Sequence, residues 1–206
     1  MMSIFKKKSS LTIYTGLMLA ALALAVAVVP ARPVQAASNK KKVEKTVRRF
    51  LNGARAYNIR KMKKCFVKEP EGVFFTDNKY MRKYCKRRNK TIRYEIRRIK
   101  VRHHHAIAVV HVSYPNAYKS IKKACKTAFQ YQHRHPGASN KKIQQILVKK
   151  IKKYDKKKFP KTNIEKTITI KLVKKKKSWK IKKMTENLLN IPHCRFYDAA
   201  YDYFNE

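Results

Sequence analysis

The stretch IRYEIRRIKVRHHHAIAVVHVSY (residues 92–114) decides the fold of this 206-residue chain. Over residues 92–96 apolar and charged side chains alternate, as they do in a half-buried β-strand. The alternation slips at Arg97 and resumes at Ile99. One extra residue that reverses the faces of a strand predicts a β-bulge, and bulges bend sheets.

The second half of this stretch predicts a strand that returns antiparallel to the first. Arg102 to His104 are expected to form the turn. Ile107 and Val109 place apolar groups opposite the main apolar set, so the returning strand is expected to be buried on both sides. The main apolar set consists of Ala106, Ala108, Val110, Val112 and Tyr114.

A second hairpin is predicted by IEKTITIKLVKKKKSWKIKKM (residues 164–184). Apolar residues alternate with polar ones up to Leu172, and the lysines at 174–177 are expected to form the turn. Trp179 and Ile181 then face inward on the return strand.

Helical segments are expected before, between and after the hairpins, because apolar residues there follow a helical spacing. A polar, lysine-rich leader (37–42) precedes a helix over 43–54. Two helices are expected within 117–155, and an amphipathic segment over 192–206 follows the last hairpin. The local signals are helix caps at Ser38 or Asn39, Asn58, Asp77, Ser139 or Asn140, and Thr185, a short strand at 73–75, and breaks at Pro115 and Pro192.

This order of helices and hairpins predicts one α+β domain over residues 43–191. We expect one curved antiparallel sheet, built from the two hairpins, with helices packed on one of its faces.

The layout resembles the nuclear transport factor 2-like superfamily, and more narrowly its small exported members in Gram-positive bacteria. The pieces that carry the resemblance are VEKTVRRFLNGARAYNIRKMKKCF (43–66) and the two hairpins. The resemblance implies a cone-shaped scaffold, in which a long helix crosses a bent sheet, and which many lineages use for binding. The family's enzymes hold an acid–base pair inside the cone. Glu95 and Glu165 lie opposite the apolar sets of their strands, so no catalytic residue carries over.

The N-terminus predicts export. Three lysines at 6–8 precede the apolar run Leu11–Val29, and Val34 and Ala36 have the spacing that a signal peptidase accepts. Residues 1–36 are therefore expected to be a signal peptide, and the rest to be secreted or bound to the cell envelope. The apolar run is also long enough to span a bilayer, so an uncleaved N-terminal anchor is the alternative.

The chain is strongly basic, with 53 Lys and Arg residues against 11 Asp and Glu residues. Four of the basic residues precede the expected cleavage site, which leaves 49 basic residues and a net charge of +38 in the exported part. Such a charge attracts polyanions. Lysine-rich composition imposed by an AT-rich genome is the alternative explanation of this charge.

The leading hypothesis is a non-enzymatic domain that associates with anionic polymers of the envelope, such as teichoic acids, or with lipid headgroups. Sequence-specific recognition of nucleic acid is not expected, because most aromatic residues fall on core-facing positions. Oligomeric state is not indicated by the sequence. The polyanion contacts expected from the densest basic runs are Lys86, Arg87, Arg88, Lys174, Lys175, Lys176 and Lys177.

Two other functions are compatible with this sequence. Tyr94, Tyr114 and Trp179 face inward, so they are expected to line the cone interior of a small-ligand or peptide-binding module. A secreted cationic toxin or antimicrobial is the other. A hydrolase would need two carboxylates that converge in one cleft, and no such pair is evident; catalytic residues and cofactors are not expected.

Four cysteines, Cys65, Cys85, Cys125 and Cys194, occupy positions in the apolar pattern. In an exported chain they permit two disulfides with three connectivities. The alternative is four buried thiols of low reactivity.

A histidine cluster, His103, His104 and His105 with His111, lies at the first hairpin. A tight metal site needs a carboxylate or thiolate partner in addition to the histidines, and none is near in the sequence. A solvated turn without a metal is therefore expected.

Overall fold

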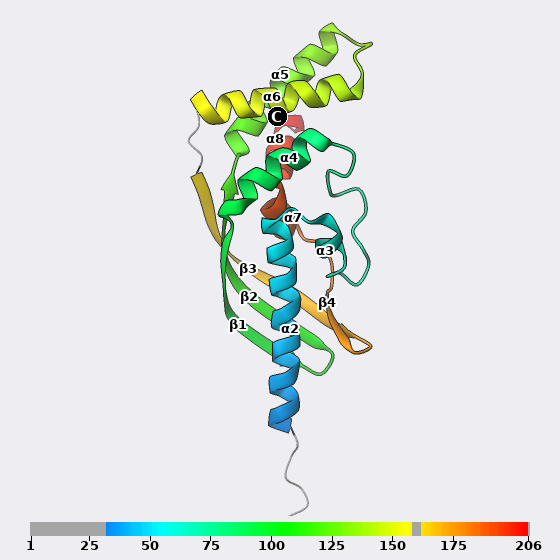
Figure 1. The fold of residues 1–206 in the computed structure, drawn as a ribbon, viewed down its shortest axis with the longest axis vertical. Coiled ribbons are helices and arrows are strands. Elements are labelled where there is room, and N and C mark those ends of the chain that lie inside the picture. Colours follow the sequence, from blue (N-terminus) through cyan, green and yellow to red (C-terminus); the bar gives the residue numbers. More distant parts are fainter. Residues whose placement is uncertain (1–31, 158–161, 206) are drawn as a thin grey trace, which may run out of the picture. The chain divides into compact units, whose positions relative to one another are not determined.

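The computed structural model describes residues 32–157 and 162–205. The chain divides into two units, residues 1–38 and 39–206, and the contacts described below lie in the second. Within the described ranges the protein is α+β, with seven α-helices and a four-stranded antiparallel sheet in the order β1-β2-β3-β4 (Figure 1). Residues 1–31, and hence most of the expected signal peptide, lie outside the described ranges. None of the helices in those ranges is both long enough and apolar enough to cross a membrane.

The sheet contains the two predicted hairpins, which are joined side by side through β2 and β3. Ile96 pairs with Val110 and Arg98 with Val109, so Arg97 is skipped in the strand pairing and forms the predicted bulge. The long pairing of β2 with β3 runs from His105↔Val173 to Asn116↔Thr162. The strands are β1 (Arg93–Arg102), β2 (His105–Asn116), β3 (Thr162–Lys175) and β4 (Ser178–Ile181).

Strand β2 is buried on one face only, which corrects the prediction of burial on both. Ala108, Val110 and Val112 are fully buried, whereas Ile107 is 42 % exposed. The reason lies in the cross-strand neighbours of Ile107, because Lys100 and Lys171 flank it on the outer face. Two long, charged side chains favour a solvated face there.

Helix α2 (Arg32–Arg55) covers the inner face of the sheet. Val43, Val47 and Phe50 are fully buried and belong to one hydrophobic cluster with the inward residues of β2, β3 and β4. The inward residues of β1 are partly buried and pack against this cluster. The helix begins before the expected position, so residues 37–42 are helical and do not form a separate leader, and Ser38 and Asn39 do not cap it. Lysine is a good helix former, so the lysine-rich segment continues the helix.

Helix α3 (Ile59–Lys63) begins at the predicted cap, since the Asn58 side chain accepts a hydrogen bond from the backbone N–H of Lys61 at 2.9 Å. It packs closely on α2 at Gly53. A Cβ at this position would lie 3.0 Å from Met62 Cγ and 3.4 Å from Met62 N. The glycine therefore permits the close approach of the two helices, although glycine is unfavourable inside a helix.

A larger side chain at Gly53 is therefore expected to destabilise the protein. Gly53→Leu should lower the free energy of unfolding by about 1–3 kcal/mol, because Met62 and its backbone must move apart from α2. Urea unfolding followed by circular dichroism measures this. Gly137→Leu is the matched control, since no atom of the described residues lies within 4 Å of a Cβ at that position. Equal stability of the two variants would contradict the close-approach argument.

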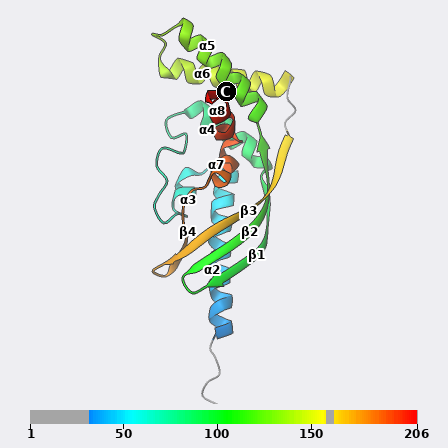
Figure 2. The same cartoon turned by 180° about the vertical axis from the view of Figure 1, so that it is seen from behind.

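Four of the helices, α4, α5, α6 and α8, build a second core that contains no strand residue within the described ranges. The expectation that the helices pack on one face of the sheet therefore fails for 117–155. These helices pack on each other and on α4 and α8 (Figure 2). The fully buried members include Met81, Cys85, Ile121 and Ile151. The helices are α4 (Lys79–Arg88), α5 (Tyr118–Arg134), α6 (Asn140–Lys157) and α8 (Phe196–Phe204), with α7 (Glu186–His193) preceding α8.

Several local predictions differ from the structure. Residues 73–75 form no strand, and Asn78, one residue after the expected Asp77, caps α4 by accepting from the N–H of Met81. Pro115 lies within β2, and α7 continues through Pro192 to end at His193, after which Cys194 adopts a left-handed conformation. Proline near a helix end removes only one donor, so it does not by itself stop the helix. The Thr185 cap is confirmed by its hydrogen bond from Leu188 N.

Candidate functional site: two basic hollows

A hollow of about 1000 Å³ lies between α3 and α4, and half of its lining residues are cations. We call it the first basic hollow. Tyr57 and Ile59 lie among the lining residues, and Glu69 is the one carboxylate among them. The basic lining residues are Arg60, Lys63, Lys79, Arg82, Lys83 and Lys86.

The phase of α4 places four of these cations on one face. Lys79, Arg82, Lys83 and Lys86 are spaced i, i+3, i+4 and i+7, which gives a single helical stripe. The Asn78 cap fixes where this helix begins. Arg82 also donates a long hydrogen bond to the Thr76 carbonyl at 3.4 Å, which ties the stripe to the preceding loop. The ammonium groups are exposed, as a surface for anions requires.

A second basic hollow, of about 280 Å³, lies where α2, the residues after α3 and the β3–β4 turn meet. No carboxylate of the described residues lines it. Lys180 Nζ donates to the Lys64 carbonyl at 2.5 Å, and Thr46 Oγ1 donates to the Trp179 carbonyl at 3.0 Å, so these segments are held together. Its basic lining residues are Lys42, Lys45, Arg49, Lys64, Lys177 and Lys180.

Consecutive residues at the end of α3 contribute to the two hollows. Lys63 lines the first and Lys64 lines the second. In the ribbon views α3 and β4 lie on one side of α2, and α4 runs across beyond its end (Figures 1 and 2). Together the two hollows gather basic residues from α2, α3, α4 and β4.

The structure distributes the predicted polyanion contacts among different places. Lys86 lines the first hollow and Lys177 the second. Arg87 is exposed on α4, outside both linings. Lys175 and Lys176 are exposed at the β3–β4 turn, and Lys174 is half-buried beside them.

Arg88 is not a surface contact, which corrects the prediction. It is 9 % exposed, and its Nε lies 3.9 Å from Asp155 Oδ2 on α6. Tyr84 donates to the same carboxylate oxygen at 2.8 Å. The signal was present in the sequence, because Arg88 follows Met81, Tyr84 and Cys85 at i+7, i+4 and i+3, on the apolar face of α4.

The expected pocket aromatics mostly fill the core. Tyr114 and Trp179 are each 2 % exposed in the first cluster, where α2 occupies the space that the small-ligand hypothesis assigned to a ligand. Tyr94 is half-buried, donates to Asn52 Oδ1 at 2.9 Å and lies under the Arg55 guanidinium at 5.6 Å. These three residues therefore do not enclose a common cavity.

Two glutamates that the sequence did not bring together share a cleft of about 530 Å³ on the outer face of the sheet. Glu95 pairs across the strands with His111, and His111 Nε2 lies 3.6 Å from Glu165 Oε2. Strand register could have revealed this neighbourhood. The glutamate side chains are 69 % and 68 % exposed, so they sit in water and not in the low-dielectric environment that tunes acid–base pairs.

The first-hairpin histidines are placed at and beside the turn. His103 and His104 form the turn, His105 begins β2, and all three are exposed. In the described ranges no three His, Cys, Asp or Glu side chains are grouped so that they could hold a metal ion.

All four cysteines are buried free thiols. Burial raises the pKa of Cys65 and of Cys125 to about 11. The pKa of Cys85 is also raised well above its usual value, first by burial and then by its side-chain contact with Cys194. Thiols with raised pKa values are poor nucleophiles at neutral pH, so Cys65, Cys85 and Cys125 are not arranged for catalysis.

Comparison with known proteins adds no relative. No protein-family model, no curated protein and no solved structure matches this chain. The comparisons thus place it in no enzyme family, and charge and geometry carry the functional argument.

Proposed function

We propose that this protein is an exported, non-enzymatic domain that binds anionic polymers of the cell envelope through the two basic hollows. The observation that carries the proposal is the first basic hollow, in which six cations face one carboxylate. Repeated phosphate groups, as in teichoic acids, are the chemistry that such a surface fits. Each lysine contributes a mobile point charge, and each arginine a planar fork for phosphate oxygens.

The binding is expected to be electrostatic and tolerant of polymer sequence. Each phosphate that a cation neutralises releases condensed counterions, so affinity falls steeply with salt. The consecutive residues Lys63 and Lys64, one in each hollow, support a run of contacts along one chain of phosphates. The polymer thereby bridges cations from four elements of the fold.

We further infer a curved scaffold of the nuclear transport factor 2-like kind, delivered by the signal in residues 1–36. The bulge at Arg97 and the long helix on the inner face of the sheet support the scaffold. The lysines at 6–8 and the apolar run that follows support the export. Such a scaffold commonly offers its interior to a ligand, whereas here α2 fills it and the outside carries the binding surface.

The test is retention of the exported protein on purified cell walls and on isolated teichoic acid as NaCl is raised. We expect the triple variant Lys79→Gln/Lys83→Gln/Lys86→Gln to bind at least about tenfold more weakly. The slope of log affinity against log salt should fall by about three, because three ammonium groups no longer pair with phosphates of the polymer.

A matched control removes the same charge from exposed strand positions outside both hollows. Lys100→Gln/Lys166→Gln/Lys171→Gln changes three exposed lysines that line neither hollow. If both triples weaken binding equally, net charge alone is responsible and the hollows are not the site. Retention that is absent at low salt, or indifferent to salt, overturns the function itself.

A further inference from the structure

A third concave surface, between α5 and α8, combines lysines with exposed aromatic rings. Its volume is about 770 Å³. We call it the α5–α8 groove. Within the described part of the chain no carboxylate lines it, and its residues are Tyr118, Lys119, Lys122, Lys123, Lys126, Phe129, Tyr203 and Phe204.

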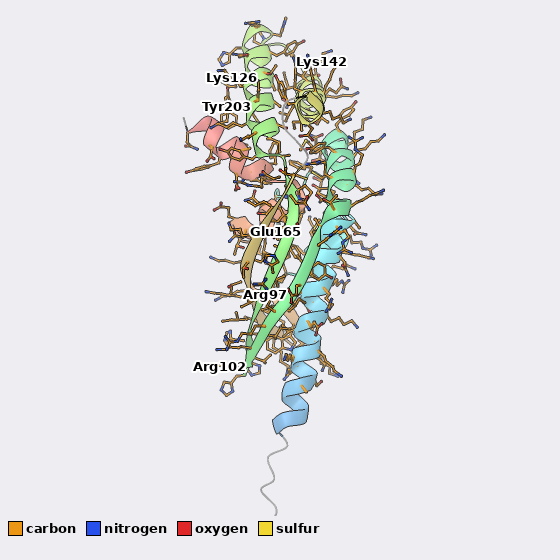
Figure 3. The ribbon with its side chains drawn as sticks, turned by 90° about the vertical axis from the view of Figure 1, so that its left-hand side faces the viewer. Arg97, Arg102, Lys126, Lys142, Glu165 and Tyr203 are labelled. Carbon is orange, nitrogen blue, oxygen red and sulfur yellow. The ribbon has the colours of Figure 1, made fainter. Side chains whose placement is uncertain are left out.

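The four lysines form one stripe of α5. Lys119, Lys122, Lys123 and Lys126 are spaced i, i+3, i+4 and i+7, while the opposite face of α5 is buried in the second core. Figure 3 shows Lys126 on α5 and Tyr203 on the neighbouring α8. The carboxylate of Asp202, on α8, accepts a hydrogen bond from the Tyr118 hydroxyl at 2.5 Å, so it is engaged at the side of the groove.

The aromatic residues form one apolar knob at the end of this stripe. Phe129 meets Tyr203 and Phe204 edge to face, with ring centroids 6.1 and 6.2 Å apart, and Tyr203 meets Phe204 at 5.1 Å. The knob is not buried, because Phe204 is 67 % and Phe129 40 % exposed. Tyr201, on α8 as well, is 69 % exposed. A cluster of large, solvent-exposed apolar side chains on a helix surface is typical of an interaction site.

We propose that the α5–α8 groove docks the protein on the surface of an anionic lipid bilayer. Aromatic rings are favoured at the boundary between headgroups and acyl chains, and lysines beside them pair with anionic headgroups while their stems lie along the apolar layer. The groove supplies both groups side by side. The inference rests on the proposed function only in that the protein is outside the cytoplasm, since the groove shares no residue with the basic hollows.

Charge decides between the bilayer and a second copy of the chain. A symmetric dimer through this groove would bring two four-lysine stripes together, and like charges at an interface oppose association. The packing of the rings also favours a bilayer over single-stranded nucleic acid as the partner of this groove. Bases stack on the open faces of separate rings, whereas these rings are packed edge to face on each other.

The test places a fluorescent reporter in the knob of the full exported protein. Phe204→Trp adds an exposed indole to a chain whose single tryptophan, Trp179, is 2 % exposed. With vesicles of phosphatidylglycerol and phosphatidylcholine that carry brominated acyl chains, we expect blue-shifted and quenched emission from the new indole. Ile107→Trp, on the outer face of the sheet, is the matched control and should not be quenched. Equal quenching of both, or none in either, overturns the proposal.

A second arm measures the lysines. Lys119→Gln/Lys126→Gln should reduce partition into the same vesicles about 25-fold, at about fivefold for each lysine near an anionic surface. Lys100→Gln/Lys171→Gln removes the same charge elsewhere and should reduce it less than about threefold. An equal loss in the two pairs overturns the site.

Further outcomes separate the rival occupants and the two proposals. Sedimentation that shows a dimer abolished by Phe204→Ser assigns the knob to a second copy, and tighter quenching by an oligonucleotide than by vesicles assigns it to nucleic acid; either overturns bilayer docking. Binding of teichoic acid should be unchanged in Lys119→Gln/Lys126→Gln. If it fails in the unmodified protein while vesicle docking persists, the proposed function falls and the docking site stands.

Discussion

Replacing Asp155 by alanine is expected to lower the free energy of unfolding by about 3 kcal/mol, the lower end of the range for breaking a buried ion pair. Asp155 is 8 % and Arg88 9 % exposed, and Arg88 Nε lies 3.9 Å from Asp155 Oδ2. Without the carboxylate the guanidinium stays buried with no opposite charge beside it among the described residues, and the Tyr84 hydroxyl loses its acceptor. The long separation of the pair explains why the lower end is expected.

Urea unfolding at neutral pH measures this effect. Asp77→Ala is the control, because Asp77 is exposed and accepts a long, 3.3 Å hydrogen bond from the neighbouring Thr76; its effect should stay below about 0.5 kcal/mol. The double variant Arg88→Met/Asp155→Leu should recover much of the loss, since an apolar pair leaves no buried charge. A loss in Asp155→Ala as small as that of the control would show that the pair is dispensable.

Acidification is expected to destabilise the protein through His193. Burial lowers the pKa of this imidazole to about 4, against about 6.5 in an unfolded chain. The ring is fully buried among Tyr57, Phe74, Phe75 and Tyr197, with Nδ1 2.7 Å from the Leu189 carbonyl. The folded state therefore holds the neutral form. Above about pH 6.5 His193 is neutral in both states and does not change the stability. As pH falls from 6.5 to 4, His193 becomes protonated in the unfolded chain but stays largely neutral in the folded protein, so the free energy of unfolding decreases. The total loss is about 3 kcal/mol.

The difference in unfolding free energy between pH 7 and pH 4, compared in the natural protein and in His193→Gln, isolates this contribution. Carboxylates titrate in both proteins and cancel in the comparison. The glutamine variant should lose about 3 kcal/mol less on acidification, although it starts from a lower stability. His133→Gln, at an exposed position of α5, is the control for the substitution itself. Identical profiles for His193→Gln and the natural protein would show that another group causes the acid sensitivity.

The sequence predicted the parts of the fold that depend on neighbours along the chain. The bulge at Arg97 followed from a slip in the alternation, and the caps at Asn58 and Thr185 followed from residue type and the apolar spacing behind them. Each of these features is local, so the information lies within a few residues. The α+β class followed because the period of the pattern changes at each boundary.

What failed depends on which element covers a given face. Periodicity shows that Tyr114 and Trp179 point inward, but not that α2 fills the space before them. In the same way the apolar faces of α5 and α6 were assigned to the sheet, whereas they pack on α4 and α8. Partners distant in the sequence leave no local signal.

The candidate surfaces were predictable only in part, for the same reason. The basic run around Lys86 was found, while the opposing contribution of α3 to the first hollow was not. The lysine stripe of α5 can be recognised in the sequence from its i, i+3, i+4, i+7 spacing. The groove, however, also requires Phe204, a residue distant in the sequence. Only the tertiary fold brings these two together.

The long α5–α6 excursion between β2 and β3 has a consequence for biogenesis. A chain made from its N-terminus finishes β2 well before β3 exists, so one rim of β2 carries bare amide and carbonyl groups throughout that interval. Such a rim is a template for stray pairing with other nascent chains. Arg98 and Lys100 of β1, which is already made, lie opposite Val109 and Ile107 of β2 and bring repulsive charge beside that strand during the interval, so part of the cationic character protects the protein while it is still being made.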